Sequence, residues 1–124
     1  MRKVVLDTNF LMLFGKFKLD LRNELERVVG EGFELFASHR IKEELGRIAS
    51  GKNAEALNAS LALSLIERMG VTLLPSQAPV DDWILENSEI GSIVCTNDKE
   101  LARKLKDKGV RVIMFKGLSK LGFV

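Results

Sequence analysis

Five short runs rich in Val, Ile, Leu and Phe alternate with longer segments in which apolar residues recur every three or four positions. Short apolar runs of this kind predict buried strands, and the longer segments predict amphipathic helices. Strands that alternate with helices are typical of a parallel sheet, because two parallel strands need a long crossover between them. The runs are residues 3–6, 33–37, 71–74, 92–96 and 110–115. The sequence therefore predicts an α/β fold.

Helical patterns fill the intervals between these runs. The segments expected to be helical are 19–29, 39–48, 53–69, from 81 or 82 to 87, and from 97 or 98 to 108. The segment 53–69 is apolar on more than one face, since a stripe of Leu57, Leu61 and Leu65 is widened by further Ala, Leu and Ile residues. A face this wide predicts either deep burial or burial against another chain. We favour the second, a homodimer.

Length and composition are typical of a single globular domain. The 124 residues fit one domain, 1–124, with an ordinary content of hydrophobic and charged residues, 46% and 29%. No apolar run approaches the roughly 18 residues of a membrane span, and the opening meets an acid too soon for a secretory leader. We therefore expect a cytoplasmic protein with no membrane partner. Cys95 is the single cysteine, which excludes an internal disulfide and suggests a core residue.

Four acidic clusters lie where apolar runs end or helical patterns begin. Asp7 and Asp98 follow the first and fourth runs, whereas Glu44 and the pair Asp81 and Asp82 lie at expected helices. Parallel strands place their carboxyl ends at one edge of a sheet, where open α/β sheets bind ligands. Carboxylates gathered there would repel one another unless a cation were present. The pattern therefore predicts a divalent metal site.

Helical phase separates the adjacent acids Glu43 and Glu44. Ile41, Leu45 and Ile48 define the buried stripe of their helix, and successive residues turn by about 100°. Glu44 then borders the stripe, while Glu43 points nearly the opposite way. A carboxylate beside an apolar face needs a partner. We therefore expect Glu44 at the metal site and Glu43 in solvent.

Each acid also has a purely structural interpretation. The acids after the strands, and one of Asp81 and Asp82, could cap the helices that begin there. Glu44 could instead pair with Arg40 or Arg47, or lie at an exposed edge. A metal site has the advantage that it explains all four clusters together.

A basic region follows the last acidic cluster. Residues 99–120 contain eight Lys or Arg and two acids, in a chain whose net charge is +2. Basic charge beside an acidic pocket suits a substrate with phosphates, although a solvated helix face explains the charge equally well. With no Tyr and 6% aromatic residues, extended base stacking is not expected. We expect Trp83 to pack in a core or interface, and the single histidine, His39, to lie on the surface or cap a helix.

At these residues the chain resembles the PIN-domain nucleases, which include the toxin ribonucleases of toxin–antitoxin pairs and processing nucleases of ribosomal RNA. V-V-L-D-T-N-F-L resembles the first motif of the family, with Asp7 as metal ligand and Thr8 and Asn9 in support. I-K-E-E-L resembles the second motif and again selects Glu44. The match covers nearly the whole length of the chain.

Two further motifs complete the resemblance. D-D-W-I-L resembles the third motif, and aligning it by the apolar pair favours Asp82 as ligand with Asp81 adjacent. I-V-C-T-N-D-K-E-L resembles the fourth, which places Thr96, Asn97 and Asp98 at the site. The resemblance implies a three-layer α/β/α sandwich with a central parallel sheet of about five strands.

The resemblance also implies a function, the hydrolysis of phosphodiester bonds in single-stranded or structured RNA with Mg²⁺ or Mn²⁺. Carboxylate ligands suit these hard cations. In that mechanism Asp7, Asp82 and Asp98 hold metal, Glu44 holds metal or orients the attacking water, and Thr96 or Asn9 binds ligands or phosphate. The residues expected to contact the RNA backbone are Lys99, Arg103, Lys104 and Lys106. The resemblance also implies a protein partner, either an antitoxin or a ribosome-assembly protein. The alternative to a ribonuclease is an inactive PIN-like RNA-binding or assembly module.

Overall fold

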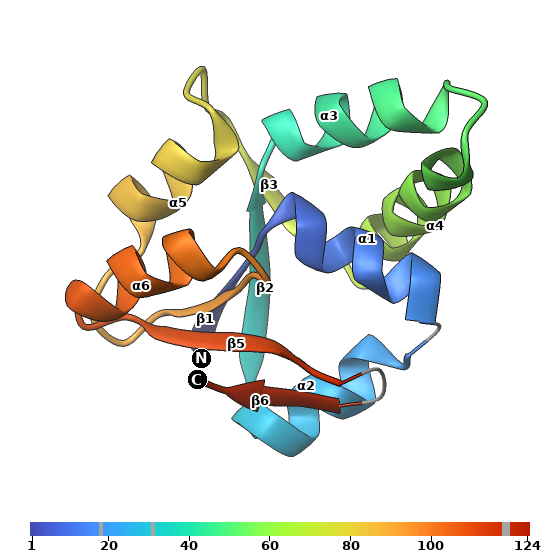
Figure 1. Cartoon of the computed structure of the whole chain (residues 1–124). Helices are drawn as coiled ribbons and strands as arrows, with labels where there is room; N and C mark the ends of the chain where they lie inside the picture. The colour runs from blue at the N-terminus through green and yellow to red at the C-terminus, as the bar shows by residue number, and fades with distance from the viewer. Residues whose placement is uncertain (18, 31, 118–119) are drawn as a thin grey trace.

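The computed structural model describes residues 1–17, 19–30, 32–117 and 120–124. Its sheet has six strands in the order β3-β2-β1-β4-β5-β6 (Figure 1). Their bounds are β1 Arg2–Leu6, β2 Phe33–Ser38, β3 Thr72–Leu74, β4 Ile93–Cys95, β5 Arg111–Lys116 and β6 Lys120–Phe123. The first five strands are parallel and match the predicted runs to within one residue, whereas β6 pairs antiparallel with β5 and was not predicted.

In the described ranges, six helices connect and cover these strands. Their bounds are α1 Thr8–Phe17, α2 Leu21–Val29, α3 Arg40–Ala49, α4 Ala54–Arg68, α5 Val80–Asn87 and α6 Lys99–Asp107. Five of them match the predicted segments to within two residues. No range was predicted for α1, because every residue from Phe10 to Phe14 is apolar and leaves no periodicity to detect.

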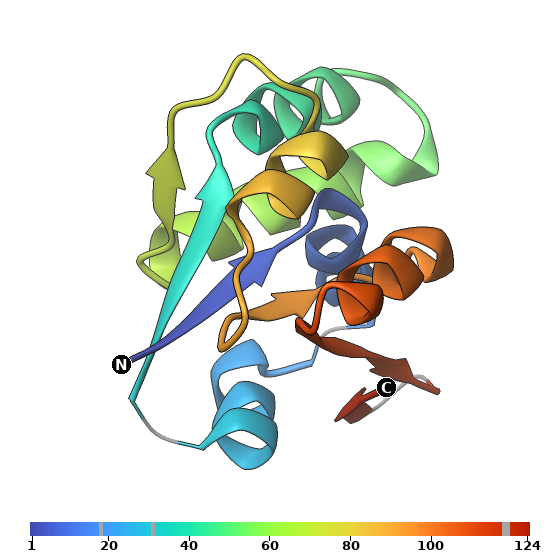
Figure 2. The same ribbon diagram turned by 90° about the vertical axis from the view of Figure 1, so that its left-hand side faces the viewer.

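The helices form a layer on each face of the sheet (Figures 1 and 2). Alternate residues of β1 point to opposite faces: Val4 and Leu6 belong to the core cluster shared with α1 to α4, and Val5 belongs to the cluster shared with α5 and α6. Val94 and Val112 continue the second cluster across β4 and β5. The predicted three-layer α/β/α sandwich is therefore confirmed, with one antiparallel strand added at its edge.

The wide apolar surface of α4 is divided between the core and solvent. Ala59, Ala62 and Ile66 are buried against the neighbouring helices α1 and α3. Leu57 and Leu61 remain 66% and 38% exposed. Packing within the chain thus accounts for one face of α4, and the homodimer stays a prediction for the other.

Two further sequence expectations concern burial. Cys95 is fully buried in β4, as predicted. Trp83 is 4% exposed and packs in the core on the α5 and α6 side of the sheet, so it is not presented to a base. Among the described residues, no helix has the length and apolarity to cross a membrane.

Candidate active site

Asp7 lies at the carboxyl end of β1, next to the end of β4. Its backbone N–H donates to the Cys95 carbonyl at 3.0 Å, which continues the pairing of the two strands. The side chain is 3% exposed. Oδ1 accepts the backbone N–H of Thr8 at 2.8 Å, and Oδ2 accepts the hydroxyl of Thr96 at 2.6 Å. The sheet therefore fixes this carboxylate from both sides.

Burial dominates the electrostatics of Asp7. The pKa of Asp7 is raised from 3.8 to about 6, first by loss of hydration, and the hydrogen bonds from Thr96 and Thr8 limit this rise. The charges of Asp81 and Asp98 contribute smaller parts of the same rise. The ionised carboxylate is therefore held in a place where a nearby cation would stabilise it.

Asp98 lies after β4 and caps α6. Its Oδ1 accepts the backbone N–H groups of Glu100 and Leu101 at 2.9 and 3.1 Å. Its own N–H donates to the hydroxyl oxygen of Thr96 at 3.1 Å. The structural interpretation of Asp98 as a cap is thus observed, and the hydroxyl of Thr96 links it to Asp7. Capping engages one oxygen of Asp98 and leaves Oδ2 for other partners.

Glu44 reaches the same region from α3. It is partly buried, and its Oε2 accepts the hydroxyl of Thr8 at 3.0 Å. Within the described part of the chain it pairs with neither Arg40 nor Arg47. Glu43, the next residue on the helix, is exposed, as the helical phase predicts.

Asp81, and not Asp82, faces the pocket formed by these residues. The pKa of Asp81 is raised, first by partial burial and then by the charges of Asp98, Glu44 and Asp82. An aspartate that responds to Asp98 and Glu44 in this way lies close to both. The structure therefore puts Asp81 in the position for which the motif resemblance favoured Asp82.

Asp81 faces the pocket because α5 begins at Val80. Val80 is already helical, and it is buried with Trp83 and Ile84. With about 100° per residue, Asp81 borders this buried stripe and Asp82 points nearly opposite. The predicted helix begins at Asp81 or Asp82, so Val80 does not contribute to its phase. A helical phase counted from Val80 would have predicted Asp81 on the pocket side of the helix.

The two asparagines predicted as supporting residues have different positions. Asn9 lines the pocket, and its Oδ1 accepts the backbone N–H of Asn97 at 3.1 Å. The Oδ1 of Asn97 accepts the backbone N–H of Phe115 at 2.9 Å, which holds the segment after β4 against β5. Asn97 therefore positions the backbone beside Asp98 and does not line the pocket.

The pocket itself has a volume of about 410 Å³. It is lined by Asp7, Thr8, Asn9, Met12, Glu44, Pro79, Val80, Asp81 and Asp98. Four carboxylates thus converge on it from the ends of β1 and β4, from α3 and from α5. Among the described side chains, no three His, Cys, Asp or Glu residues are close enough to form a metal site as they are placed. The carboxylates surround the pocket and are not drawn together at one point.

The basic residues of α6 lie in two environments. A separate hollow of about 400 Å³ is lined by Lys99, Ala102, Arg103, Lys106, Asp107, Met114 and Val124. Arg103 pairs with Glu100 at 2.6 Å and with Asp107 at 3.3 Å, so its charge is largely offset. The charge of Lys104 lowers the pKa of Asp81 and so acts against the causes that raise it.

Comparison with known proteins agrees with this arrangement. Residues 4–118 match the family described as "PIN like domain". The chain is 35% identical over 120 residues to Ribonuclease VapC4 of Methanocaldococcus jannaschii, covering 92% of this chain and 90% of that protein. It is 36% identical over 113 residues to Ribonuclease VapC9 of Archaeoglobus fulgidus, covering 90% and 81%. Its fold is similar to that of the PIN domain endonuclease Utp24, with a TM-score of 0.80, 22% identity, and 98% and 90% of the two chains covered.

Proposed function

Because the chain belongs to the PIN-like domain family, we propose that it is a ribonuclease that hydrolyses phosphodiester bonds in RNA with the help of Mg²⁺ or Mn²⁺. The observation that carries this proposal is the convergence of Asp7, Glu44, Asp81 and Asp98 on one pocket. Two relatives similar over most of the chain are named ribonucleases. Single-stranded or structured RNA is the proposed substrate class.

The donor set of the pocket suits a hard divalent cation. All the charged groups that line it are carboxylates, the ligands that Mg²⁺ and Mn²⁺ prefer. The raised pKa values of Asp7 and Asp81 come first from burial and then from the neighbouring carboxylates, and a bound cation would offset both effects. Such an ion, when bound, lowers the pKa of a water molecule and offsets the developing charge on the phosphate. Asp7, Asp81 and Asp98 are the residues proposed to hold it.

The other polar residues keep these carboxylates in place. Thr96 fixes Oδ2 of Asp7, and Thr8 fixes Oε2 of Glu44. Glu44 keeps its second oxygen for a metal or for the proton of an attacking water. Asn9 lies at the pocket wall with a side-chain amide available to a phosphate oxygen. In this proposal Thr8 and Thr96 act as positioning residues.

The experiment that tests the proposal is cleavage of labelled single-stranded RNA with Mn²⁺. Asp7→Asn is expected to lower the rate by about 100-fold or more, as for groups that act on the reacting atoms. Asp81→Asn and Asp82→Asn form a matched pair, because they remove the same charge from adjacent residues. We expect the first to lose activity and the second to retain most of it.

Two outcomes would contradict the proposal. Equal traces of cleavage from the wild type and Asp7→Asn would indicate a contaminating nuclease and favour an RNA-binding or assembly module without catalysis. Equal losses for Asp81→Asn and Asp82→Asn would instead contradict the assignment of Asp81 to the site. Copurification of a partner protein would test the proposed antitoxin or ribosome-assembly context.

A further inference from the structure

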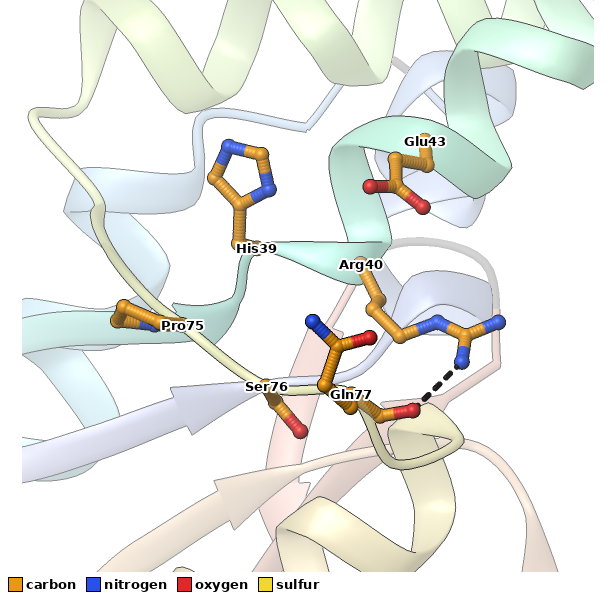
Figure 3. A pocket seen from close by; sticks show the side chains of 6 residues that line it. All are labelled: His39, Arg40, Glu43, Pro75, Ser76 and Gln77. Atoms are coloured by element: carbon orange, nitrogen blue, oxygen red, sulfur yellow. Dashed lines mark hydrogen bonds between the residues drawn. The ribbon is translucent and has the colours of Figure 1, made fainter.

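A second polar pocket, of about 520 Å³, lies between the start of α3 and the segment after β3 (Figure 3). It is lined by His39, Arg40, Glu43, Pro75, Ser76 and Gln77. We propose that this pocket binds a guanine base of the RNA strand, at a fixed distance from the phosphodiester that is cut. The proposal rests on the proposed ribonuclease function for the identity of the strand, and its binding chemistry is tested separately.

The two walls of the pocket are joined by hydrogen bonds. The backbone N–H of His39 donates to the Leu74 carbonyl at 2.8 Å. Nη1 of Arg40 donates to the Gln77 carbonyl at 2.9 Å, which spans the pocket floor in Figure 3. The Ser76 hydroxyl accepts a backbone N–H two residues later at 3.0 Å and tightens the loop. Because these hydrogen bonds already hold the walls together, little conformational entropy is lost when a ligand binds.

This pocket and the carboxylate pocket are lined by neighbouring residues of the same two segments. On α3, Arg40, Glu43 and Glu44 lie on one side of the helix, and Glu44 is the one nearest the core. Along the chain, residues 75–77 line the second pocket and residues 79–81 line the first. Arg40 of the second pocket and Glu44 of the first are four residues apart on α3, a rise of roughly 6 Å. One RNA strand can occupy both.

Arg40 and Glu43 together provide the donors and acceptors that guanine requires. Arg40 uses Nη1 for the loop and its Nε is buried, which leaves Nη2 as its remaining donor. Glu43 is exposed and forms no ion pair within the described ranges. On one edge guanine presents the acceptor O6, which arginine recognises, beside the N1–H and N2–H donors, which a carboxylate accepts as a bidentate pair. In Figure 3 Arg40 is drawn between Glu43 and Gln77, with its guanidinium directed to the Gln77 carbonyl.

The negative charge of Glu43 favours guanine over a phosphate as the ligand of this pocket. An anion in the pocket would be attracted by Arg40 and repelled by Glu43, so Glu43→Gln would strengthen its binding. A guanine that donates to Glu43 would lose a hydrogen bond to a charged acceptor, so the same variant would weaken its binding. The sign of one mutational effect therefore distinguishes the two ligands.

The test is binding of short fluorescent RNAs to the Asp7→Asn protein, followed by fluorescence anisotropy. The probes are oligouridylates that carry one central G, A or C. We expect the probe with G to bind about tenfold more tightly than the others, the discrimination given by one bidentate pair. Glu43→Gln and Arg40→Gln should each reduce this preference to about twofold or less. The matched controls Glu67→Gln and Arg22→Gln remove the same charges from exposed positions on α4 and α2 and should preserve it.

Equal affinity for all probes, or tighter binding by Glu43→Gln, would overturn the guanine subsite. Because Glu43 is exposed, its variant tests the proposal even if Arg40→Gln is poorly folded. Cleavage by the wild type is measured on the same probes. A G preference in binding without cleavage would support the subsite and contradict the ribonuclease function, whereas cleavage without a G preference in binding would do the reverse.

Discussion

The raised pKa of Asp7 predicts how the free energy of unfolding changes with pH, which can be measured without a substrate. The carboxyl group is 3% exposed, and its pKa rises from 3.8 to about 6 on folding. A shift of about two units corresponds to roughly 3 kcal/mol, since each unit is about 1.4 kcal/mol. Ionising Asp7 at neutral pH therefore costs the metal-free fold a sizeable share of a typical stability of about 5–15 kcal/mol.

The sign of this effect follows from the direction of the shift. The folded protein binds the Asp7 proton more tightly than the unfolded chain does, because its pKa is the higher of the two. The resulting contribution to stability is complete below pH 3.8 and is lost as the pH rises to about 6. Asn does not titrate, so Asp7→Asn loses this dependence. The difference in unfolding free energy between variant and wild type should shift in favour of the variant by roughly 2 kcal/mol from pH 4 to pH 7.

The assay is urea denaturation of both proteins in EDTA at several pH values between 4 and 7. The comparison across pH matters because Asn cannot accept both hydrogen bonds of Asp7, from Thr8 and Thr96, and this loss adds an offset at every pH. Differences that stay constant from pH 4 to pH 7 would refute the reasoning, since they would mean that the Asp7 carboxylate is not destabilised by burial.

Adding Mn²⁺ at pH 7 extends the same experiment. A cation that binds only the folded state stabilises it by about 2.7 kcal/mol when present at 100 times its dissociation constant. We expect this gain for the wild type and little of it for Asp7→Asn. Below pH 6 the gain should decline, because protons compete with the metal for the carboxylates. Equal stabilisation of both proteins would place the bound ion elsewhere.

Three other predictions concern packing and assembly. Thr96→Val removes the hydrogen bond to the buried carboxylate and should cost about 1–3 kcal/mol in urea denaturation, with a further rise in the pKa of that carboxyl group by NMR titration. Gly15→Ala places a Cβ 2.7 Å from the backbone of α4 and should lower the melting temperature, whereas Gly46→Ala, with nothing within 4 Å, should preserve or raise it. Light scattering should show a dimer that Leu57→Lys with Leu61→Lys converts to a monomer; a monomeric wild type would contradict the predicted homodimer.

The sequence predicted the five parallel strands well because each is a short, strongly apolar run with polar or turn-forming flanks. It did not predict β6, whose four residues, K-L-G-F, include Lys120 and Gly122 and lack a recognisable strand pattern. That strand forms because it pairs with the edge of β5 and because Arg27 of α2 donates to the Leu121 carbonyl at 2.7 Å. The contact with Arg27 joins residues 94 positions apart, so local patterns carry little information about it.

The site residues were predictable to the extent that helical phase was defined. Glu44 was assigned correctly to the pocket side of α3 because three apolar residues of that helix fix its orientation. Asp81 and Asp82 belong to the first turn of α5, where the orientation depends on whether Val80 is helical. The predicted segment excluded Val80, so phase gave no answer and the motif resemblance favoured the outer residue. An error of one or two residues at a helix start is thus enough to exchange a pocket residue for an exposed one.

The same geometry explains why adjacent acids in this chain can serve different purposes. A step of about 100° separates neighbours on a helix, so Glu44 faces the carboxylate pocket while Glu43 faces the pocket proposed for guanine. If both assignments hold, the rigid turn of α3 from Arg40 to Glu44 sets the distance between the base that is bound and the bond that is cut. Cleavage should then occur at a constant number of nucleotides from the guanine, whatever the sequence around it. Because aromatic residues for base stacking are scarce, this one contact would supply most of the selectivity.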